Sequence, residues 1–348
     1  MIPEIMNAVY IPEKGKAEVK SFKTPVPQEG EVLVRLKHCL ICTWERRIFS
    51  GTDVALPFVP GHEISGEIAA IPEGTITNLV VGQKVVVKTF DSCGECEYCR
   101  RGLDNLCKGK SKKRFYDGIP GSGGLAQFIA IASNRVFPLD NQDVDLKLAA
   151  FAEPVACCLH SIGQAKIELS EDVLIIGGGI MGQLHAALAK LKGARVILVE
   201  PDTKRRELAQ KIGADIVIDP SAESVSEKVT ALTNGRGPHV IIFTVNSLQL
   251  ASDYIKLLAP AGRLVYYGSF HPKGEILFDP NNIHYSEKNL TGSFSPTVEA
   301  FWTASRLISF GILDVKPFLS AEFDMKDCQK AFEQSLDPIN YRVMINLD

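Results

Sequence analysis

The stretch Asp172-Val-Leu-Ile-Ile-Gly-Gly-Gly-Ile-Met-Gly182 decides the fold class of this chain. Its apolar start, residues 172–176, is typical of a strand buried on both faces, and residues 180–192 read as a helix. Between them, Gly177, Gly179 and Gly182 fit the pattern G-x-G-x-x-G. After a buried strand and before a helix, this pattern predicts a dinucleotide site. A plain strand–helix turn without a ligand is the alternative.

The three glycines have different tasks in such a turn. Gly177 permits the tight turn, Gly179 lets a pyrophosphate approach the backbone, and Gly182 lets helix and strand pack closely. The helix start, with Ile180 and Met181, faces the phosphates with unpaired N–H groups and the positive end of the helix dipole.

Further strands and helices alternate beyond this turn. We expect strands at 195–200, 216–218, 240–243 and 263–267, and helices at 204–212, 224–233 and 248–258. Alternation at this spacing indicates right-handed βαβ units and a doubly wound parallel sheet.

Glu200 ends the second strand of this series. An acidic side chain there can accept hydrogen bonds from the ribose hydroxyls and would repel a 2′-phosphate, which favours NAD over NADP. Lys204, Arg205 and Arg206 could tolerate that phosphate if they turned inward. An exposed helix face is the alternative for this trio, with Arg205 covering the adenine side.

The first third of the chain is β-rich instead. Residues 31–37 alternate apolar and polar side chains, as a half-buried strand does, and residues 63–71 and 84–89 look similar. Prolines and glycines separate these runs, which indicates a small, irregular β-barrel. At the other end of the chain we expect helices at 298–310 and 326–335 and a final strand at 341–347.

The bulk properties exclude several classes of protein. A chain of 348 residues favours two domains. A net charge of −3 gives no attraction to nucleic acid or to an anionic membrane. No apolar run approaches the roughly 20 residues of a membrane span, and the first residues lack the layout of a signal peptide. We therefore expect a cytoplasmic protein that binds neither nucleic acid nor membrane, with the basic run 108–114 as a solvated loop.

Four of the nine cysteines are clustered. Cys93, Cys96, Cys99 and Cys107 form C-x2-C-x2-C-x7-C, a spacing that matches tetrahedral Zn²⁺. Four sulfurs leave no ligand position open, so this zinc is expected to be structural. An iron–sulfur cluster and free thiols are the alternatives.

Three further segments can be interpreted together with these motifs: Cys42-Thr-Trp-Glu45, Gly61-His62-Glu63 and Glu153-Pro154. Together with the cysteine cluster and the glycine turn, they resemble the zinc-containing medium-chain dehydrogenases. The resemblance is nearest to the sorbitol and polyol dehydrogenase branch, which includes the sugar-alcohol-phosphate dehydrogenases.

This resemblance implies an α/β architecture, with a GroES-like β-barrel catalytic domain and a Rossmann NAD-binding domain. The barrel domain would span 1–154 with a structural-zinc lobe at about 91–109. The Rossmann domain would span 155–294, and 295–348 would return to the catalytic domain. The family also suggests a homodimer or homotetramer.

The resemblance assigns a second, catalytic zinc to Cys42, His62 and Glu153, with Glu63 as an adjacent acid that can enter the coordination sphere. Three protein ligands leave one position open for water or substrate. The implied reaction passes a hydride between a secondary alcohol of a polyol or sugar derivative and NAD. Taken singly, each residue also fits an ordinary structural role: Cys42 as a buried thiol, His62 as a satisfied polar residue and Glu153 as a helix cap.

The chain departs from the family next to the first ligand. The family has a hydroxyl residue and then a histidine as a proton relay, where this chain has Trp44 and Arg47. Neither side chain can pass a proton on, so zinc-bound water, Glu63 or a substrate group would have to. Glu45 replaces an aspartate and could orient His62, or lie on the surface.

Trp44 and Arg47 leave the substrate open. Trp44 could line the substrate pocket or fill the barrel core. Arg47 could bind a substrate carboxylate or phosphate, bind the NAD pyrophosphate, or lie exposed. These departures also motivate a second hypothesis, a dehydrogenase-fold protein that binds NAD and zinc as a sensor or partner-binding module. A third is a zinc-free quinone or enoyl reductase, which metal analysis would distinguish.

Overall fold

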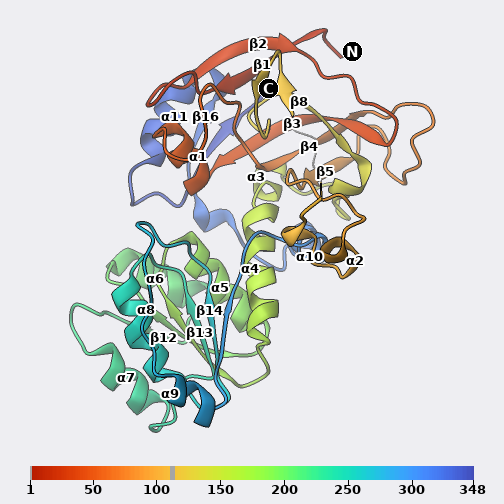
Figure 1. Cartoon of the computed structure of the whole chain (residues 1–348). Helices are drawn as coiled ribbons and strands as arrows, with labels where there is room; N and C mark the ends of the chain where they lie inside the picture. Colours follow the sequence, from red (N-terminus) through yellow and green to blue (C-terminus); the bar gives the residue numbers. More distant parts are fainter. Residues whose placement is uncertain (1, 110–113) are drawn as a thin grey trace. The chain divides into compact units, whose positions relative to one another are not determined.

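The computed structural model describes residues 2–109 and 114–348, so the predicted basic loop lies partly outside the described residues, at 110–113. The chain divides into two compact units. Unit 1 comprises Met1–Ala156 and Pro296–Asp348, and unit 2 comprises Cys157–Ser295 (Figure 1).

Unit 1 is built on a seven-stranded, mainly antiparallel sheet, with strand order β16-β17-β3-β4-β5-β9 and β8 paired to β3. The strands are β3 (Glu31–Ile41), β4 (Glu63–Ala70), β5 (Lys84–Val87), β8 (Phe128–Ala132), β9 (Val136–Pro138), β16 (Leu319–Asp324) and β17 (Arg342–Asn346). Two short pairs accompany it: β1 (Ile5–Tyr10) with β2 (Glu18–Lys23), and β6 (Phe115–Tyr116) with β7 (Ile119–Pro120). The helices assigned to this unit are α1 (Thr43–Phe49), α2 (Glu97–Arg100), α3 (Leu146–Ala149), α10 (Val298–Ser309) and α11 (Cys328–Ser335).

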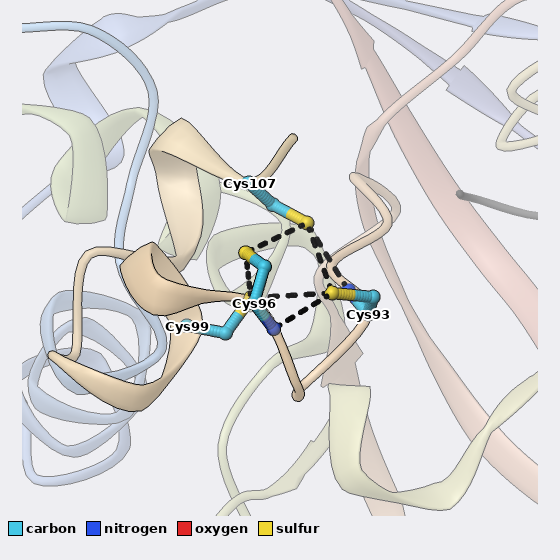
Figure 2. A group of neighbouring side chains, drawn as sticks. All are labelled: Cys93, Cys96, Cys99 and Cys107. Carbon is cyan, nitrogen blue, oxygen red and sulfur yellow. Dashed lines mark hydrogen bonds between the residues drawn. The ribbon is translucent and has the colours of Figure 1, made fainter. Parts of the chain in front are cut away.

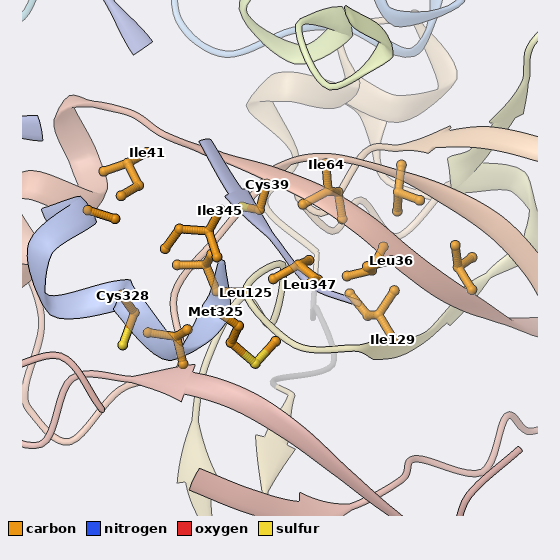
Figure 3. Packing of buried hydrophobic residues seen from close by; sticks show 14 of the residues in the cluster. Leu36, Cys39, Ile41, Ile64, Leu125, Ile129, Met325, Cys328, Ile345 and Leu347 are labelled. Carbon is orange, nitrogen blue, oxygen red and sulfur yellow. The ribbon is translucent and has the colours of Figure 1, made fainter. Parts of the chain in front are cut away.

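The core of unit 1 joins residues from both ends of the chain. Side chains of β3, β4 and β8 pack there with Met325, Cys328, Ile345 and Leu347 (Figure 3). Strand β17 pairs with β3 in antiparallel register, Ile345 opposite Cys39. The C-terminal strand β17 therefore joins the sheet of the N-terminal strand β3.

Unit 2 holds a six-stranded parallel sheet of order β12-β11-β10-β13-β14-β15. Its strands are β10 (Asp172–Ile176), β11 (Arg195–Val199), β12 (Ile216–Ile218), β13 (Val240–Phe243), β14 (Arg263–Tyr266) and β15 (Asn289–Gly292). The helices are α5 (Ile180–Leu191), α6 (Thr203–Ile212), α7 (Val225–Leu232), α8 (Leu248–Tyr254) and α9 (Pro280–Tyr285). This is the doubly wound order in which dinucleotides bind where the strand order reverses, and it confirms the predicted fold class.

The elements that the sequence did not predict lie at sheet edges or are short. Strand β15 has one apolar residue, Leu290, and no buried position, so its sequence carries no strand signal. Strands β1 and β2 and helix α9 were also not predicted, and the last helix begins at Cys328 rather than at residue 326. For β15 the reason is that a strand with one apolar side chain creates no alternating pattern.

Helix α4 (Ala152–Ala165) runs from unit 1 into unit 2. With α3 it forms the segment Leu146–Ala165, whose length and composition would suit a membrane span. However, 67% of that apolar stretch is buried inside the molecule, which is also how a core helix looks.

Candidate active site and cofactor-binding residues

The four clustered cysteines converge in a loop around α2 (Figure 2). The sulfur–sulfur distances are 3.6 Å for Cys96–Cys99 and Cys93–Cys107, 3.9 Å for Cys96–Cys107 and 4.0 Å for Cys93–Cys99. Four sulfurs held about 2.3 Å from one ion at tetrahedral angles lie about 3.8 Å apart. The donor set therefore fits a single zinc ion, whereas an iron–sulfur cluster would spread its cysteines further apart.

Backbone N–H groups donate hydrogen bonds to sulfurs of this cluster, which favours the thiolate form that binds a cation. The amides of Cys93 and Gly109 donate to Cys107 Sγ at 3.2 and 3.3 Å. Hydrogen bonds from the backbone around Cys99 and Lys108 lower the pKa of Cys96 to about 6. A Cβ at Gly109 would lie 2.3 Å from Cys93 Sγ, so no larger residue fits.

A second donor group lies buried in the barrel, where Cys42, His62 and Glu63 place their ligand atoms within 4.8 Å of one another. Cys42 is the N-cap of α1, and its sulfur accepts the Trp44 N–H at 3.1 Å. His62 precedes β4, and its Nε2 lies 3.6 Å from Cys42 Sγ. The chain can place His62 there because the preceding residue is a glycine. A Cβ on Gly61 would lie 2.4 Å from the Leu125 amide nitrogen, so no larger residue fits.

Glu45 orients this centre. It is fully buried; its Oε1 lies 2.7 Å from His62 Nδ1 and accepts the Gly61 N–H, while its Oε2 accepts the Cys42 N–H. Burial alone would raise the pKa of Glu45, but the charge and hydrogen bond of His62 outweigh it and lower that pKa. Glu45 accepts the hydrogen bond from His62 Nδ1–H, and a neutral His62 held in this way would present its Nε2 lone pair to a metal. A surface position for Glu45, the alternative in the sequence, is therefore wrong.

The Cys42 sulfur also suits a metal. Burial raises the pKa of its thiol to about 11. A thiol with such a pKa becomes a thiolate near neutral pH only when a cation binds it.

Glu63 has a partner that the sequence did not indicate. Arg342 of β17 donates from Nε to Glu63 Oε2 at 2.8 Å and from an NH2 group to Oε1 at 2.7 Å. Both side chains are buried. The two residues are 279 positions apart, and only the pairing of β17 with β3, next to β4, brings them together.

Glu153 lies near this pair without joining the donor group. It is buried in the first turn of α4. Burial would lower the pKa of Arg342, but the charge and hydrogen bonds of Glu63 raise that pKa more strongly, and the charge of Glu153 also raises it. Within the described residues, the donor group contains Cys42, His62 and Glu63 but not Glu153.

Aromatic rings surround His62. Trp44 packs edge-on against His62, with ring centroids 5.4 Å apart, and against Phe58 at 5.9 Å. Phe90 also packs edge-on against His62, with ring centroids 6.1 Å apart. The sequence pointed to Trp44 but not to Phe58 or Phe90, because an isolated phenylalanine between strands carries no signal of its own. Arg47 donates from Nε to Asp53 at 2.8 Å.

The glycine turn in unit 2 has the steric properties that its pattern predicted. Gly177 has φ +99, and a Cβ on Gly182 would lie 1.8 Å from the Gly177 carbonyl oxygen. In contrast, a Cβ on Gly179 would meet nothing within 4 Å, and Gly179 begins α5 without a side-chain cap. The space over Gly179 and the N–H groups of the first α5 turn, which includes Ile180 and Met181, therefore fit a pyrophosphate.

Glu200 follows β11, and 5% of it is exposed. Its Oε2 accepts the Gly178 N–H at 2.6 Å, and its Oε1 accepts the Asp202 N–H at 3.0 Å. Backbone donors thus fix the carboxylate beside the glycine turn.

The basic trio does not act as a group. Arg206 donates to the Glu200 and Pro201 carbonyls and to Thr203 Oγ1, and pairs with Asp219 at 2.8 Å. Arg205 donates its backbone N–H to Asp202, and Lys204 is exposed. The guanidinium of Arg206 is therefore already bound within the protein.

Comparison with known proteins agrees with this geometry. Residues 28–141 match the alcohol dehydrogenase GroES-like domain, and residues 181–309 match the zinc-binding dehydrogenase domain. The chain is 29% identical to L-galactonate-5-dehydrogenase of Escherichia coli (strain K12), covering 98% of this chain and 97% of the relative. It is 30% identical to sorbitol dehydrogenase of Halalkalibacterium halodurans, covering 91% and 92%.

A solved structure resembles the whole chain. A protein from Sinorhizobium meliloti 1021, assigned to the zinc-binding dehydrogenases and bound to NADP, superposes with a TM-score of 0.89 at 26% identity, covering 99% of this chain and 100% of that one. The predicted zinc and nicotinamide cofactors are thereby confirmed as those of the family. The chain belongs to the zinc-dependent medium-chain dehydrogenases, oxidoreductases that act on CH–OH groups, in the polyol dehydrogenase-like branch.

Proposed function

We propose that this enzyme transfers a hydride between a secondary alcohol of a polyol or sugar derivative and NAD. The observation that carries the proposal is the buried Cys42–His62 pair, held by Glu45 in the form that binds a metal. Similarity to dehydrogenases of a sugar acid and of sorbitol supports the substrate class. Unit 1 would serve as the catalytic domain and unit 2 as the NAD-binding domain.

The protein's own residues orient the reaction. A zinc ion at Cys42 and His62 would supply a Lewis acid that makes an alcohol more acidic, and the nicotinamide supplies the hydride chemistry. Glu45 fixes His62, and Arg342 fixes Glu63. Trp44 and Phe90 pack edge-on against His62, and Phe58 packs against Trp44.

The proton leaves without the family's usual relay. The indole of Trp44 has one N–H and no basic atom, and the guanidinium of Arg47 is paired with Asp53. Glu63 is the carboxylate next to the pair, but Arg342 already donates a hydrogen bond to each of its oxygens. We therefore infer that solvent or a substrate group accepts the proton.

We propose Glu153 as a third metal ligand, as the family pattern implies. Its position in α4, buried and electrostatically linked to Arg342, supports a place near the centre. A Glu153→Gln variant should lose one zinc per chain while keeping the second. A variant that keeps both zinc ions with unchanged affinity would exclude Glu153 as a ligand.

We propose NAD rather than NADP as the cofactor. Glu200 presents a fixed carboxylate at the ribose position, and Arg206 is bound to carbonyls and to Asp219. The similar structure with NADP is a different protein and does not decide this chain's preference. In a Glu200→Ala variant, the NAD Kd should rise about 10- to 100-fold while the NADP Kd falls, because the repulsion of the 2′-phosphate is gone.

The deciding experiment is a screen of polyols, their phosphates, sugar acids and amino alcohols with NAD. We expect NADH formation with a polyol or sugar derivative, lost on removal of zinc and restored by adding it back. Activity that persists without zinc would refute the mechanism. Trp44 and Arg47 motivate the alternative of a catalytically silent NAD- and zinc-binding module, which silence throughout the screen with intact NAD binding would favour.

We also propose a cytoplasmic homodimer or homotetramer. The edge strand β15 supports self-association, as do exposed apolar side chains close to it in the sequence: Leu277, Tyr285 and Phe294. Sedimentation equilibrium tests this, since a monomer at micromolar concentration would exclude it.

A further inference from the structure

One segment joins the two predicted metal centres. Residues 88–93, here called the connecting segment, run from the end of β5 to Cys93, the first sulfur of the four-cysteine cluster. Phe90 lies in its middle and packs against His62. Phe90 is 44% exposed, so part of its ring remains accessible next to His62.

Two arginines hold the backbone of this segment. Arg135, 8% exposed, donates to the Phe90 carbonyl and the Asp91 carboxylate from one NH2 group and to the Ser92 carbonyl from the other. Arg114 donates twice to the Thr89 carbonyl and once to Asp91 Oδ1. The carbonyls on both sides of Phe90 are therefore bound by rigid, planar donors.

Packing alone does not fix this segment. Asp91, Ser92, Arg114 and Arg135 line a cavity of about 430 Å³ in unit 1. On that side, the hydrogen bonds from Arg114 and Arg135 hold the segment next to open space.

The four-cysteine lobe is tied to the same segment. Lys88, 2% exposed, pairs with Asp104 at 2.9 Å, and Asp104 also accepts the Val298 N–H. Asp104 lies between the third and fourth cysteines of the cluster. Both ends of the connecting segment are thus fixed, one by the Lys88–Asp104 pair and the other by Cys93.

We propose that Arg135, assisted by Arg114, is a positioning residue for substrate binding: it sets Phe90 against His62 and so couples the four-cysteine zinc lobe to the catalytic centre. This inference rests on the proposed function. It assigns the zinc lobe a role in shaping the substrate site in addition to bracing the fold.

Steady-state kinetics of the holoenzyme with its best polyol substrate test the coupling. Arg135→Met should raise the substrate KM about 10-fold or more, since small displacements of positioning groups have large effects, while the NAD KM and both zinc ions stay unchanged. Arg135→Lys, which keeps the charge but not the planar fork, should show a smaller rise. If Arg135→Met does not fold, Arg114→Met provides the same measurement.

Arg101→Met is the matched control. Arg101 lies in the four-cysteine lobe and pairs with Glu97 in an exposed position, so its loss should leave the substrate KM unchanged. An equal rise in the substrate KM of Arg101→Met and Arg135→Met would show that Arg135 acts only through the general stability of the lobe, and would overturn the proposal.

A double-mutant cycle separates positioning through Phe90 from other effects. Phe90→Ala should raise the substrate KM by itself, and Arg135→Met should add little to it, because both changes remove the same contact. Independent, multiplying effects on KM would contradict the proposal.

Fluorescence gives a reading that does not depend on activity. The chain has two tryptophans, so a Trp302→Phe background leaves Trp44, which touches His62. Arg135→Met should shift the Trp44 emission to longer wavelength, as water enters beside His62, and Arg101→Met should not. A wild-type enzyme inactive in the whole substrate screen would refute the proposed function, whereas an unshifted Trp44 emission would refute the coupling.

Discussion

At the scale of single residues, one buried carboxylate organises the candidate catalytic centre. Glu45 meets His62, Gly61 and Cys42 at once. A longer acid stands here where the family has aspartate, and the capping box of α1 accommodates it, because Glu45 is the N3 residue of that helix. Helix geometry and metal chemistry therefore depend on the same side chain.

Replacing Glu45 should weaken the catalytic metal site. In Glu45→Ala, zinc affinity or kcat/KM should fall about 10- to 100-fold, because His62 loses the acceptor that fixes its tautomer. Metal analysis after dialysis, together with kinetics, measures this. The exposed Glu13→Ala serves as the control, and normal metal content and activity in Glu45→Ala would show that the orientation of His62 does not matter.

At the scale of secondary structure, the turn between β10 and α5 separates folding from binding. Gly182 is needed because the strand carbonyl lies against it, whereas Gly179 faces open space. Gly182 is thus required by the fold, and Gly179, three residues earlier, by the ligand.

Alanine should weaken NAD binding at one of these positions and lower stability at the other. Gly179→Ala should keep its stability but raise the NAD Kd at least about 10-fold, since the methyl group occupies the space of the pyrophosphate. Gly182→Ala should lower the free energy of unfolding by about 1–3 kcal/mol through overpacking. Calorimetry and NAD titration of both variants test this, and equal NAD affinity in Gly179→Ala and wild type would contradict it.

Helix α5 also carries a buried histidine that makes stability depend on pH. His185 is fully buried; its Nδ1 donates to the Met181 carbonyl at 2.6 Å, and burial lowers its pKa to about 4. The unfolded chain, with a histidine pKa near 6.5, binds the proton first as the pH falls. This contribution is therefore fully present above about pH 6.5 and is lost between about 6.5 and 4.

Between pH 7 and pH 5 the wild type should lose about 2 kcal/mol of stability through His185 alone. In His185→Leu this part of the pH dependence should disappear, whatever the change in stability at pH 7. Urea unfolding of both proteins at the two pH values measures the difference. Parallel pH profiles would show that His185 is not protonated on unfolding in this range.

At the scale of the whole molecule, the two units have separate cores and separate cofactor chemistry. Unit 1 holds both donor groups for metal, and unit 2 holds the glycine turn and Glu200. A loss in one unit should therefore leave the binding chemistry of the other intact.

Removing the structural zinc tests this independence. Cys107→Ser should lose one zinc per chain and lower the Tm of unit 1, because the metal contributes directly to the stability of its lobe. The NAD Kd should change less than about twofold. Cys157→Ser, outside both donor groups, is the control, and a collapse of NAD binding in Cys107→Ser would contradict the separation.

The sequence by itself determined what depends on local spacing. The strand–glycine–helix pattern predicted the parallel sheet, and the four cysteines within 93–107 predicted a zinc lobe, because both signals lie within a few residues. Cys42 and His62 could be predicted as metal ligands because they occur in the order of the family's motifs. Edge elements such as β15, with one apolar residue, gave no pattern.

Tertiary structure alone decided the contacts between distant segments. Arg342 reaches Glu63 only because β17 adds to the sheet of β3. Phe90 meets His62 from a segment whose carbonyls are bound by Arg135 and Arg114. Sequence patterns report which face of an element is apolar, but they do not report which elements pair. A long-range ion pair or ring contact therefore has no local signature, and the surroundings of the catalytic centre follow from the fold.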